Sequence, residues 1–127
     1  MTLERVEKLM GNTVYVRVMR DRLKVRSLDS GKEIEATSPF STTRLLVGNF
    51  TGAQAALKEA ITKAAGGGWF KPSARVVMHP LEMTEGGLSE IEERILHELA
   101  IGAGAMKAVV WVGPPLSDAE VMEKVAR

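Results

Sequence analysis

Apolar and polar residues alternate along the first quarter of the chain, which is the pattern of β-strands with one buried face. One alternating segment covers residues 14–19, VYVRVM, and a second covers 23–27, LKVRS. The residues DSG at 29–31 then mark a turn, because glycine adopts positive φ values without strain. A third extended segment follows at Lys32–Thr43, which we expect to be interrupted or ended near Pro39. The three segments predict an antiparallel meander.

The spacing of apolar residues changes to a helical period near residue 50. Phe50 lies where a hydrophobic staple would begin, Thr51 is the expected N-cap, and Gln54 completes a capping box. One helical face is apolar and comprises Leu57, Ala60, Ile61 and Ala64. The run of glycines at 66–68 predicts the end of this helix.

The second half of the chain predicts strands that alternate with helices. Ala74–Met78 is a short apolar strand that Pro80 stops. Ser89 and Glu92 form a second capping box. The helix that follows has an apolar stripe of Ile91, Ile95, Leu96 and Leu99. Two glycines, at 102 and 104, predict its end.

The last predicted elements are a strand and a short helix. Lys107–Val112, KAVVWV, is almost continuously apolar, as expected for a strand covered on both faces. Two prolines at 114 and 115 break the chain, and Ser117 caps a final helix that reaches Arg127. The element order predicts an α/β fold: a mixed five-stranded sheet, made of the antiparallel meander and a parallel β-α-β crossover, with helices on its faces.

The domain organisation that we expect is simple. Residues 12–127 are long enough for one domain with its own core. Residues 1–11 form a separate short amphipathic segment, since one helical face gathers Leu3, Val6, Leu9 and Met10. Such a segment could dock on its own domain, on a partner or, weakly, on a membrane surface.

Composition and charge exclude several classes of protein. The chain has no cysteine, which excludes a disulfide scaffold and a thiolate metal site and is compatible with the cytoplasm. The net charge of +1 is too small to indicate a nucleic-acid partner. Basic residues crowd the first quarter and glutamates crowd the third. This asymmetry either orients a partner or reflects solvated strand and helix faces.

The C-terminal half carries a family resemblance. One long segment resembles the bacterial rod-shape-determining actin homologues, the MreB family: RVVMHPLEMTEGGLSEIEERILHELAIGAGAMKAVVWVGPP. As in that family, its order is a strand, a proline turn, a Glu/Arg-rich helix, and a Gly-Ala helix end before an apolar strand. KEIEATSPFS and LLVGNFTGAQAALKEAITK resemble that family's third strand and first long helix. The similarity covers nearly the whole chain but only the family's first subdomain. It implies the subdomain of an actin-like ATPase, with a ribonuclease H-like fold.

The resemblance also implies that the ATPase residues are lost. The family's Asp-x-Gly-Thr phosphate turn falls on Arg17, Val18, Met19 and Arg20, so a cation replaces a carboxylate and methionine replaces glycine. The family's acidic pair before a proline falls on Val112 and Gly113, before Pro114. The second phosphate loop and the adenosine pocket belong to the other half of the fold. We therefore expect no ATP hydrolysis, no enzyme activity and no bound cofactor.

Three functional hypotheses remain open at this point. The first is a non-catalytic interaction module that binds a cytoskeletal or cell-shape protein, or a second copy of itself. Its expected surface comprises Glu82, Glu85, Gly113, Pro114 and Pro115. The alternative is a nucleotide- or anion-binding regulatory domain that uses Arg17 and Arg20, unless these two side chains simply point to solvent. Either protein would be cytoplasmic, or peripheral at the inner membrane through residues 1–11.

A third hypothesis is a small enzyme. His79 follows a strand, where catalytic groups of α/β proteins are common, and Glu82 or Glu85 could assist it. Glu93 and His97 are spaced i,i+4 on one helix and could bind a metal. Two ligands do not make a site, so we expect no metal and interpret them as part of a solvated helix face.

Overall fold

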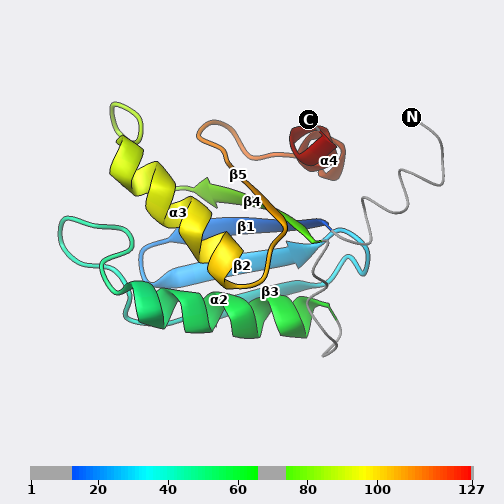
Figure 1. Ribbon diagram of the computed structural model, residues 1–127, viewed down its shortest axis with the longest axis horizontal. Helices are drawn as coiled ribbons and strands as arrows, with labels where there is room; N and C mark the ends of the chain where they lie inside the picture. Colours follow the sequence, from blue (N-terminus) through cyan, green and yellow to red (C-terminus); the bar gives the residue numbers. More distant parts are fainter. Residues whose placement is uncertain (1–12, 66–73, 127) are drawn as a thin grey trace.

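The computed structural model describes residues 13–65 and 74–126, which form one five-stranded sheet flanked by helices (Figure 1). In chain order the elements are β1 (Thr13–Met19), β2 (Arg22–Ser27), β3 (Glu33–Thr37), α2 (Phe50–Ala64), β4 (Arg75–Pro80), α3 (Glu90–Gly102), β5 (Lys107–Val110) and α4 (Asp118–Ala126). The order of strands across the sheet is β3-β2-β1-β4-β5.

Strand directions divide the sheet into two parts. β1 pairs antiparallel with β2, and β2 pairs antiparallel with β3. β4 runs parallel to β1, and β5 runs parallel to β4. The predicted antiparallel meander, the parallel crossover and the α/β class are therefore confirmed.

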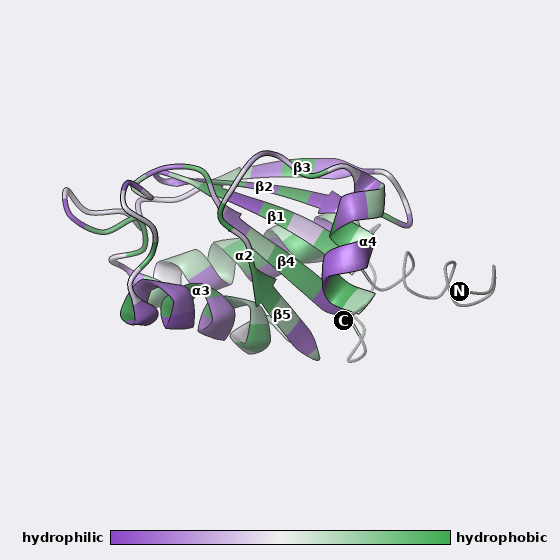
Figure 2. Cartoon of the chain, turned by 90° about the horizontal axis from the view of Figure 1, so that it is seen from above, coloured by the Kyte–Doolittle hydropathy of each residue, from purple (hydrophilic) through white to green (hydrophobic). Residues whose placement is uncertain are grey.

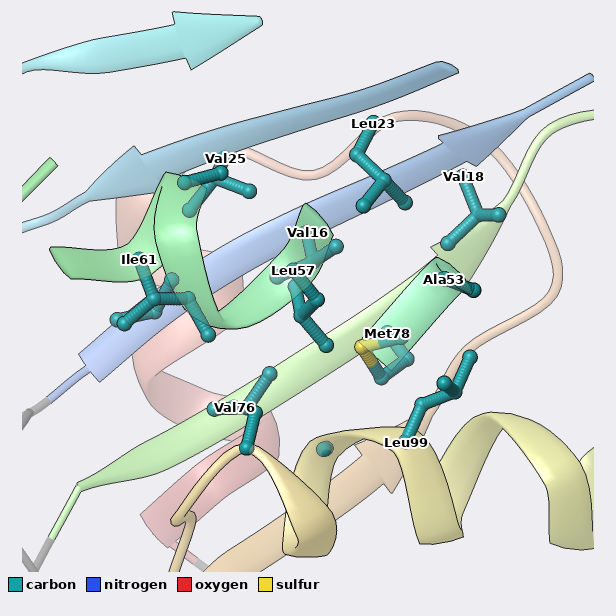
Figure 3. Close-up of a cluster of buried hydrophobic side chains, with 14 of the residues drawn as sticks. Val16, Val18, Leu23, Val25, Ala53, Leu57, Ile61, Val76, Met78 and Leu99 are labelled. Carbon is teal, nitrogen blue, oxygen red and sulfur yellow. The ribbon is translucent and has the colours of Figure 1, made fainter. Parts of the chain in front are cut away.

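Helices cover both faces of the sheet, and each face has its own core. α2 and α3 lie on one face, and α4 lies on the other (Figure 1). The valines at even positions of β1 point toward α2, with Leu57 and Ile61 packed above them (Figure 3). Tyr15 points to the opposite face, where it packs with Val121 and Val125 of α4. Figure 2 shows the green apolar positions on the inner strands and the purple polar positions on the outer surface of α3.

Two of the predicted helix starts are confirmed, and one is wrong. Ser89 Oγ accepts from Glu92 N, and Glu92 Oε1 accepts from Ser89 N, so α3 begins with the predicted capping box. Ser117 caps α4 in the same way. The N-cap of α2 is Asn49 rather than Thr51, because Asn49 Oδ1 accepts from Gly52 N at 3.0 Å and the helix starts at Phe50.

One further expectation is confirmed and two need correction. β3 ends at Thr37, close to Pro39 as expected, and the chain then enters a loop that is tied back to the turn after β1. Ile91 is 74% exposed on the first turn of α3 and does not belong to the buried face of that helix, which comprises Leu96, Leu99 and Ala100. β5 ends at Val110, and its four residues are all half-buried because the strand lies at an edge of the sheet. The predicted segment 1–11 and the glycines at 66–68 lie outside the described residues.

Candidate functional site

The candidate site is the edge of the sheet where the parallel strands β1, β4 and β5 end. In α/β proteins, ligands bind beyond the carboxyl ends of parallel strands. Here the turn at residues 20–21, the loops at 81–89 and 111–117, and the loop at 38–49 meet at this edge. Most of the residues singled out in the sequence lie in or beside these loops.

The turn after β1 is held by the chain's own side chains. Arg20 N donates to Glu82 Oε2 at 2.5 Å, and Asp21 N donates to Ser41 Oγ at 3.0 Å. Asp21, at a φ of 55°, accepts from Ser41 N through its carboxylate at 2.7 Å. The Arg20 guanidinium donates to Thr42 O at 2.7 Å. These bonds join the turn to the loops at 38–49 and 81–89.

This arrangement leaves little for an anion to bind. A phosphate loop works because free backbone N–H groups point at the ligand. The N–H groups of Arg20 and Asp21 already have acceptors, and one of these is a carboxylate, Glu82. Met19, at the glycine position implied by the resemblance, is 7% exposed and contacts Arg22 through its sulfur. The N–H groups of Arg20 and Asp21 are therefore occupied by the protein's own side chains.

Arg17 and Arg20 do not converge. Arg17 lies within β1 on the face of Tyr15, with its guanidinium carbon 5.3 Å from that ring centroid, and it pairs with Glu33 of β3. Val18, between them, is fully buried in the core under α2 and α3. Neither arginine simply points to solvent, and the structure does not assemble a two-arginine anion site.

A buried hydrogen-bond chain lies behind the same edge. His79 is 0% exposed, its Nδ1 lies 2.7 Å from Tyr15 Oη, and its Nε2 lies 2.9 Å from Gly113 O. Leu116 N donates to Tyr15 Oη at 3.2 Å. The chain of bonds thus connects β1 and β4 to the loop at 111–117.

The bonds assign the protons of His79. A carbonyl oxygen only accepts, so Nε2 carries the hydrogen and donates it to Gly113 O. Nδ1 of the neutral ring is then the acceptor for the Tyr15 hydroxyl. Burial lowers the pKa of His79 below its ordinary value, the Gly113 bond partly offsets this, and the positive charge of Arg17 lowers it further. His79 is held as a neutral structural side chain.

The residues of the enzyme hypothesis, His79, Glu82 and Glu85, are not assembled into a catalytic group. Both nitrogens of His79 are occupied, and Glu82 is engaged with the turn at Arg20. Glu85 is exposed on the loop beyond. Within residues 13–65 and 74–126, no three His, Cys, Asp or Glu side chains cluster as metal ligands, so Glu93 and His97 have no third member there.

An apolar groove opens at the site. It lies between the loop at 38–49, the end of β4 and the start of α3, and its walls include Leu45, Met83, Leu88, Ile91 and Ile95. Glu82 and Glu92 also line it. Leu45 is 47% exposed and Ile91 is 74% exposed, so the groove presents apolar surface to solvent.

The other predicted surface residues lie on the loop after β5. Gly113, Pro114 and Pro115 are exposed, although the carbonyl of Gly113 is bound to His79 and that of Pro114 accepts from Trp111 Nε1 at 2.9 Å. The structure brings this loop and Glu82 to the same edge of the sheet.

Sequence reasoning missed the residues that organise the site. Tyr15, Asp21 and Ser41 act through partners 20 or more residues away, and no local pattern marks them. A partial signal was present for Ser41, since the sequence predicts that the third extended segment is interrupted or ends near Pro39, two residues earlier. Nothing in the sequence indicated which backbone group it would meet.

Comparisons with known proteins give one informative match. No model of a known protein family matches the chain. The chain is similar to a curated protein of Escherichia coli (strain K12), "Uncharacterized protein YjaA", with 40% identity over 101 residues. The aligned region covers 76% of this chain and 80% of YjaA. No helix within the described residues is both long and apolar enough to cross a bilayer.

Proposed function

This chain belongs to the family of YjaA from Escherichia coli (strain K12), and we propose that its members are non-catalytic, actin-like interaction modules. The module would bind a protein of the bacterial cell-shape cytoskeleton. Its fold would be that of the first subdomain of the MreB family, a ribonuclease H-like unit. The resemblance of the sequence to that family supports the proposal, as does the sheet, which follows an antiparallel meander with two parallel strands.

The observation that carries the proposal is the state of the carboxyl edge. In an ATPase this edge would keep free N–H groups and carboxylates for phosphate and metal. Here Glu82 and Ser41 occupy the N–H groups of the turn, while Leu45 and Ile91 expose an apolar groove beside it. An edge that is closed to phosphate but open to apolar side chains suits a protein partner.

Co-sedimentation with filaments of a purified MreB-family protein tests this function. We expect the chain to pellet with filaments and to stay in the supernatant without them. Ile91→Glu places a charge in the groove at a side chain that is already 74% exposed, so the fold should tolerate it while binding falls at least about tenfold. Ile101→Glu, at the far end of α3, is the matched control and should pellet like the wild type.

The anion-binding alternative is tested in the same preparation. In a thermal-shift screen, nucleotides and phosphates should leave the melting temperature unchanged if the N–H groups of the turn are occupied by the protein's own side chains. A shift with a nucleotide, together with no co-sedimentation, would favour the regulatory domain over the interaction module.

A further inference from the structure

β5 is the last strand of the sheet in the described part of the chain. Met106 N and Lys107 N both donate to Ala74 O, at 2.8 and 3.4 Å, and Trp111 N donates to Met78 O at 2.9 Å, so the regular alternation of β5 begins at Lys107. Hydrogen-bonding groups alternate in direction along a strand. The N–H and C=O groups of Ala108 and Val110 therefore point away from β4, toward the outer edge.

The two edges of the sheet differ in how they are protected. β3, at the opposite edge, carries Glu33 and Glu35, and charged side chains on an edge strand oppose pairing with another chain. β5 has no acidic residue, no proline and no bulge, and Lys107 turns its amino group to Val125 O at 3.1 Å. In the described residues, β5 is the less protected of the two edge strands, and the α3 side chains Glu90, Glu93, Arg94, His97 and Glu98 line the groove along it.

Exposed apolar side chains lie just before and just after β5, at the two ends of this edge. Of the six large apolar side chains that are exposed in the described residues, three lie in or beside the groove of the candidate site. Of the other three, Met106 and Val112 lie just before and just after β5, and Ile101 lies on the last turn of α3. Met106 is 53% exposed and Val112 is 41% exposed. They lie three residues before and three residues after Val109.

We propose that a second copy of this chain pairs with the edge of β5, antiparallel and about a two-fold axis at Val109. Val109 then lies opposite the partner's Val109, and Ala108 lies opposite the partner's Val110. Met106 meets the partner's Val112, so each exposed apolar side chain covers the other. Such an interface is isologous, as two-fold dimers require.

The backbone supports this register independently of the side chains. Opposite residues of an antiparallel pair alternate between hydrogen-bonded and non-hydrogen-bonded pairs. The outward-pointing groups belong to Ala108 and Val110, and the axis at Val109 places these two residues opposite each other. Both side chains also face the α3 side of the sheet, where they pack against the same core.

Neighbouring registers fit less well. An axis at Ala108 would place Val112 opposite the partner's Gly104, and an axis at Val110 would place Met106 opposite the partner's Pro114. Either shift leaves an exposed apolar side chain uncovered. A two-fold axis midway between two residues would place side chains that point to opposite faces of the sheet opposite each other, which a pleated sheet does not allow.

This surface adds self-association to the proposed interaction module and in that sense rests on it. It uses the edge of β5, whereas the filament partner uses the groove with Leu45, Met83 and Leu88, and Ile91 lies between the two surfaces. The tests below contain no filament. A failure here leaves the co-sedimentation result standing, and a failure of co-sedimentation leaves the dimer standing.

Disulfide trapping tests the axis directly, because the chain has no cysteine of its own. Val109→Cys places two thiols at a non-hydrogen-bonded pair, where Cα atoms lie about 4.5 Å apart, within the range a disulfide spans. We expect a covalent dimer on a non-reducing gel after mild oxidation. Leu45→Cys, an exposed position in the groove, is the control for random collisions.

Light scattering over a dilution series tests the surface without a covalent bond. The wild type should show the mass of a dimer. Met106→Lys with Val112→Lys sets like charges opposite each other twice and should raise the dissociation constant about tenfold or more. Met106→Glu with Val112→Lys sets opposite charges at the same places and should restore the dimer.

Three results would overturn the proposal. One is a wild type that stays monomeric at every concentration. Another is a dimer that the double-lysine variant does not weaken. The third is cross-linking of Val109→Cys no greater than that of Leu45→Cys. Circular dichroism and a thermal melt of each variant show that it is folded, which makes each result decisive.

Discussion

The hydroxyl of Tyr15 donates to Nδ1 of His79 at 2.7 Å, across two neighbouring strands and 64 residues of sequence. The two rings stack with their planes 17° apart. Since Leu116 N donates to the same hydroxyl and His79 donates to Gly113 O, this pair holds the loop after β5 against the sheet.

Tyr15→Phe tests the contribution of this hydroxyl to stability. The change keeps the ring but leaves Nδ1 of His79 and the N–H of Leu116 without their partner. We expect the free energy of unfolding to fall by about 1–3 kcal/mol, the cost of leaving a buried polar group unsatisfied. Denaturant titration measures it, and Thr62→Val, which removes an exposed helix hydroxyl, should change stability by less than about 0.5 kcal/mol.

His79 predicts a pH dependence of stability. Its pKa is lowered in the fold, so the unfolded chain binds the proton first as the pH falls. Its contribution is complete above the ordinary pKa of 6.5 and is lost as the pH falls from there toward the lowered value. We expect the free energy of unfolding to decrease below pH 6.5, by at most about 1.4 kcal/mol per pH unit for one proton.

The matched variants for this measurement are His79→Gln and His97→Gln. His79→Gln should flatten the slope below pH 6.5, because glutamine does not titrate. His97, the chain's other histidine, lies on the exposed surface of α3, and its replacement is the control for the substitution of a histidine by glutamine. An unchanged slope in His79→Gln would assign the pH dependence to another group.

Calorimetric titration with Mg-ATP tests whether the turn after β1 binds nucleotide. We expect no saturating heat up to millimolar nucleotide, because Glu82 and Ser41 already accept from the N–H groups of the turn. Glu82→Ala removes the carboxylate from Arg20 N and should give weak binding of inorganic phosphate. Glu85→Ala, at the exposed end of the same loop, should not. A saturating isotherm with the wild type would contradict the interpretation of Arg20 as a structural residue.

The pair of Arg26 and Asp118 predicts a second, acidic transition. Arg26 Nε and Nη2 donate to the two carboxylate oxygens of Asp118 at 3.0 and 3.1 Å, which joins β2 to the start of α4. The hydrogen bonds from Arg26 lower the pKa of Asp118 below 3.8. The pair therefore stabilises the fold above that pH and is lost as the pH falls through the lowered value.

Asp118→Asn measures this contribution. Because both side chains are partly exposed, we expect a loss of less than about 1 kcal/mol at neutral pH. The difference from the wild type should disappear in acid, where the wild-type carboxyl is also neutral. A difference that persists at low pH would mean that shape, rather than charge, holds α4 in place.

The sequence by itself determined the order and type of the elements. Alternation of period two predicted β1 and β2, and capping residues such as Ser89 and Ser117 predicted the starts of α3 and α4. These features depend on neighbours within about four residues, which the sequence contains directly. The coarse α/β class followed from the same local signals.

Only the tertiary structure decided which residues contact one another across the fold. Tyr15 meets His79, and Arg20 meets Glu82, because parallel strands bring the ends of β1 and β4 to one edge. Ile91 is exposed although its helical period places it with the apolar stripe, since the period does not show which turns of α3 the neighbouring elements cover. A periodic pattern states which face is apolar, but strand order decides what covers that face and which backbone edge stays open, as at β5.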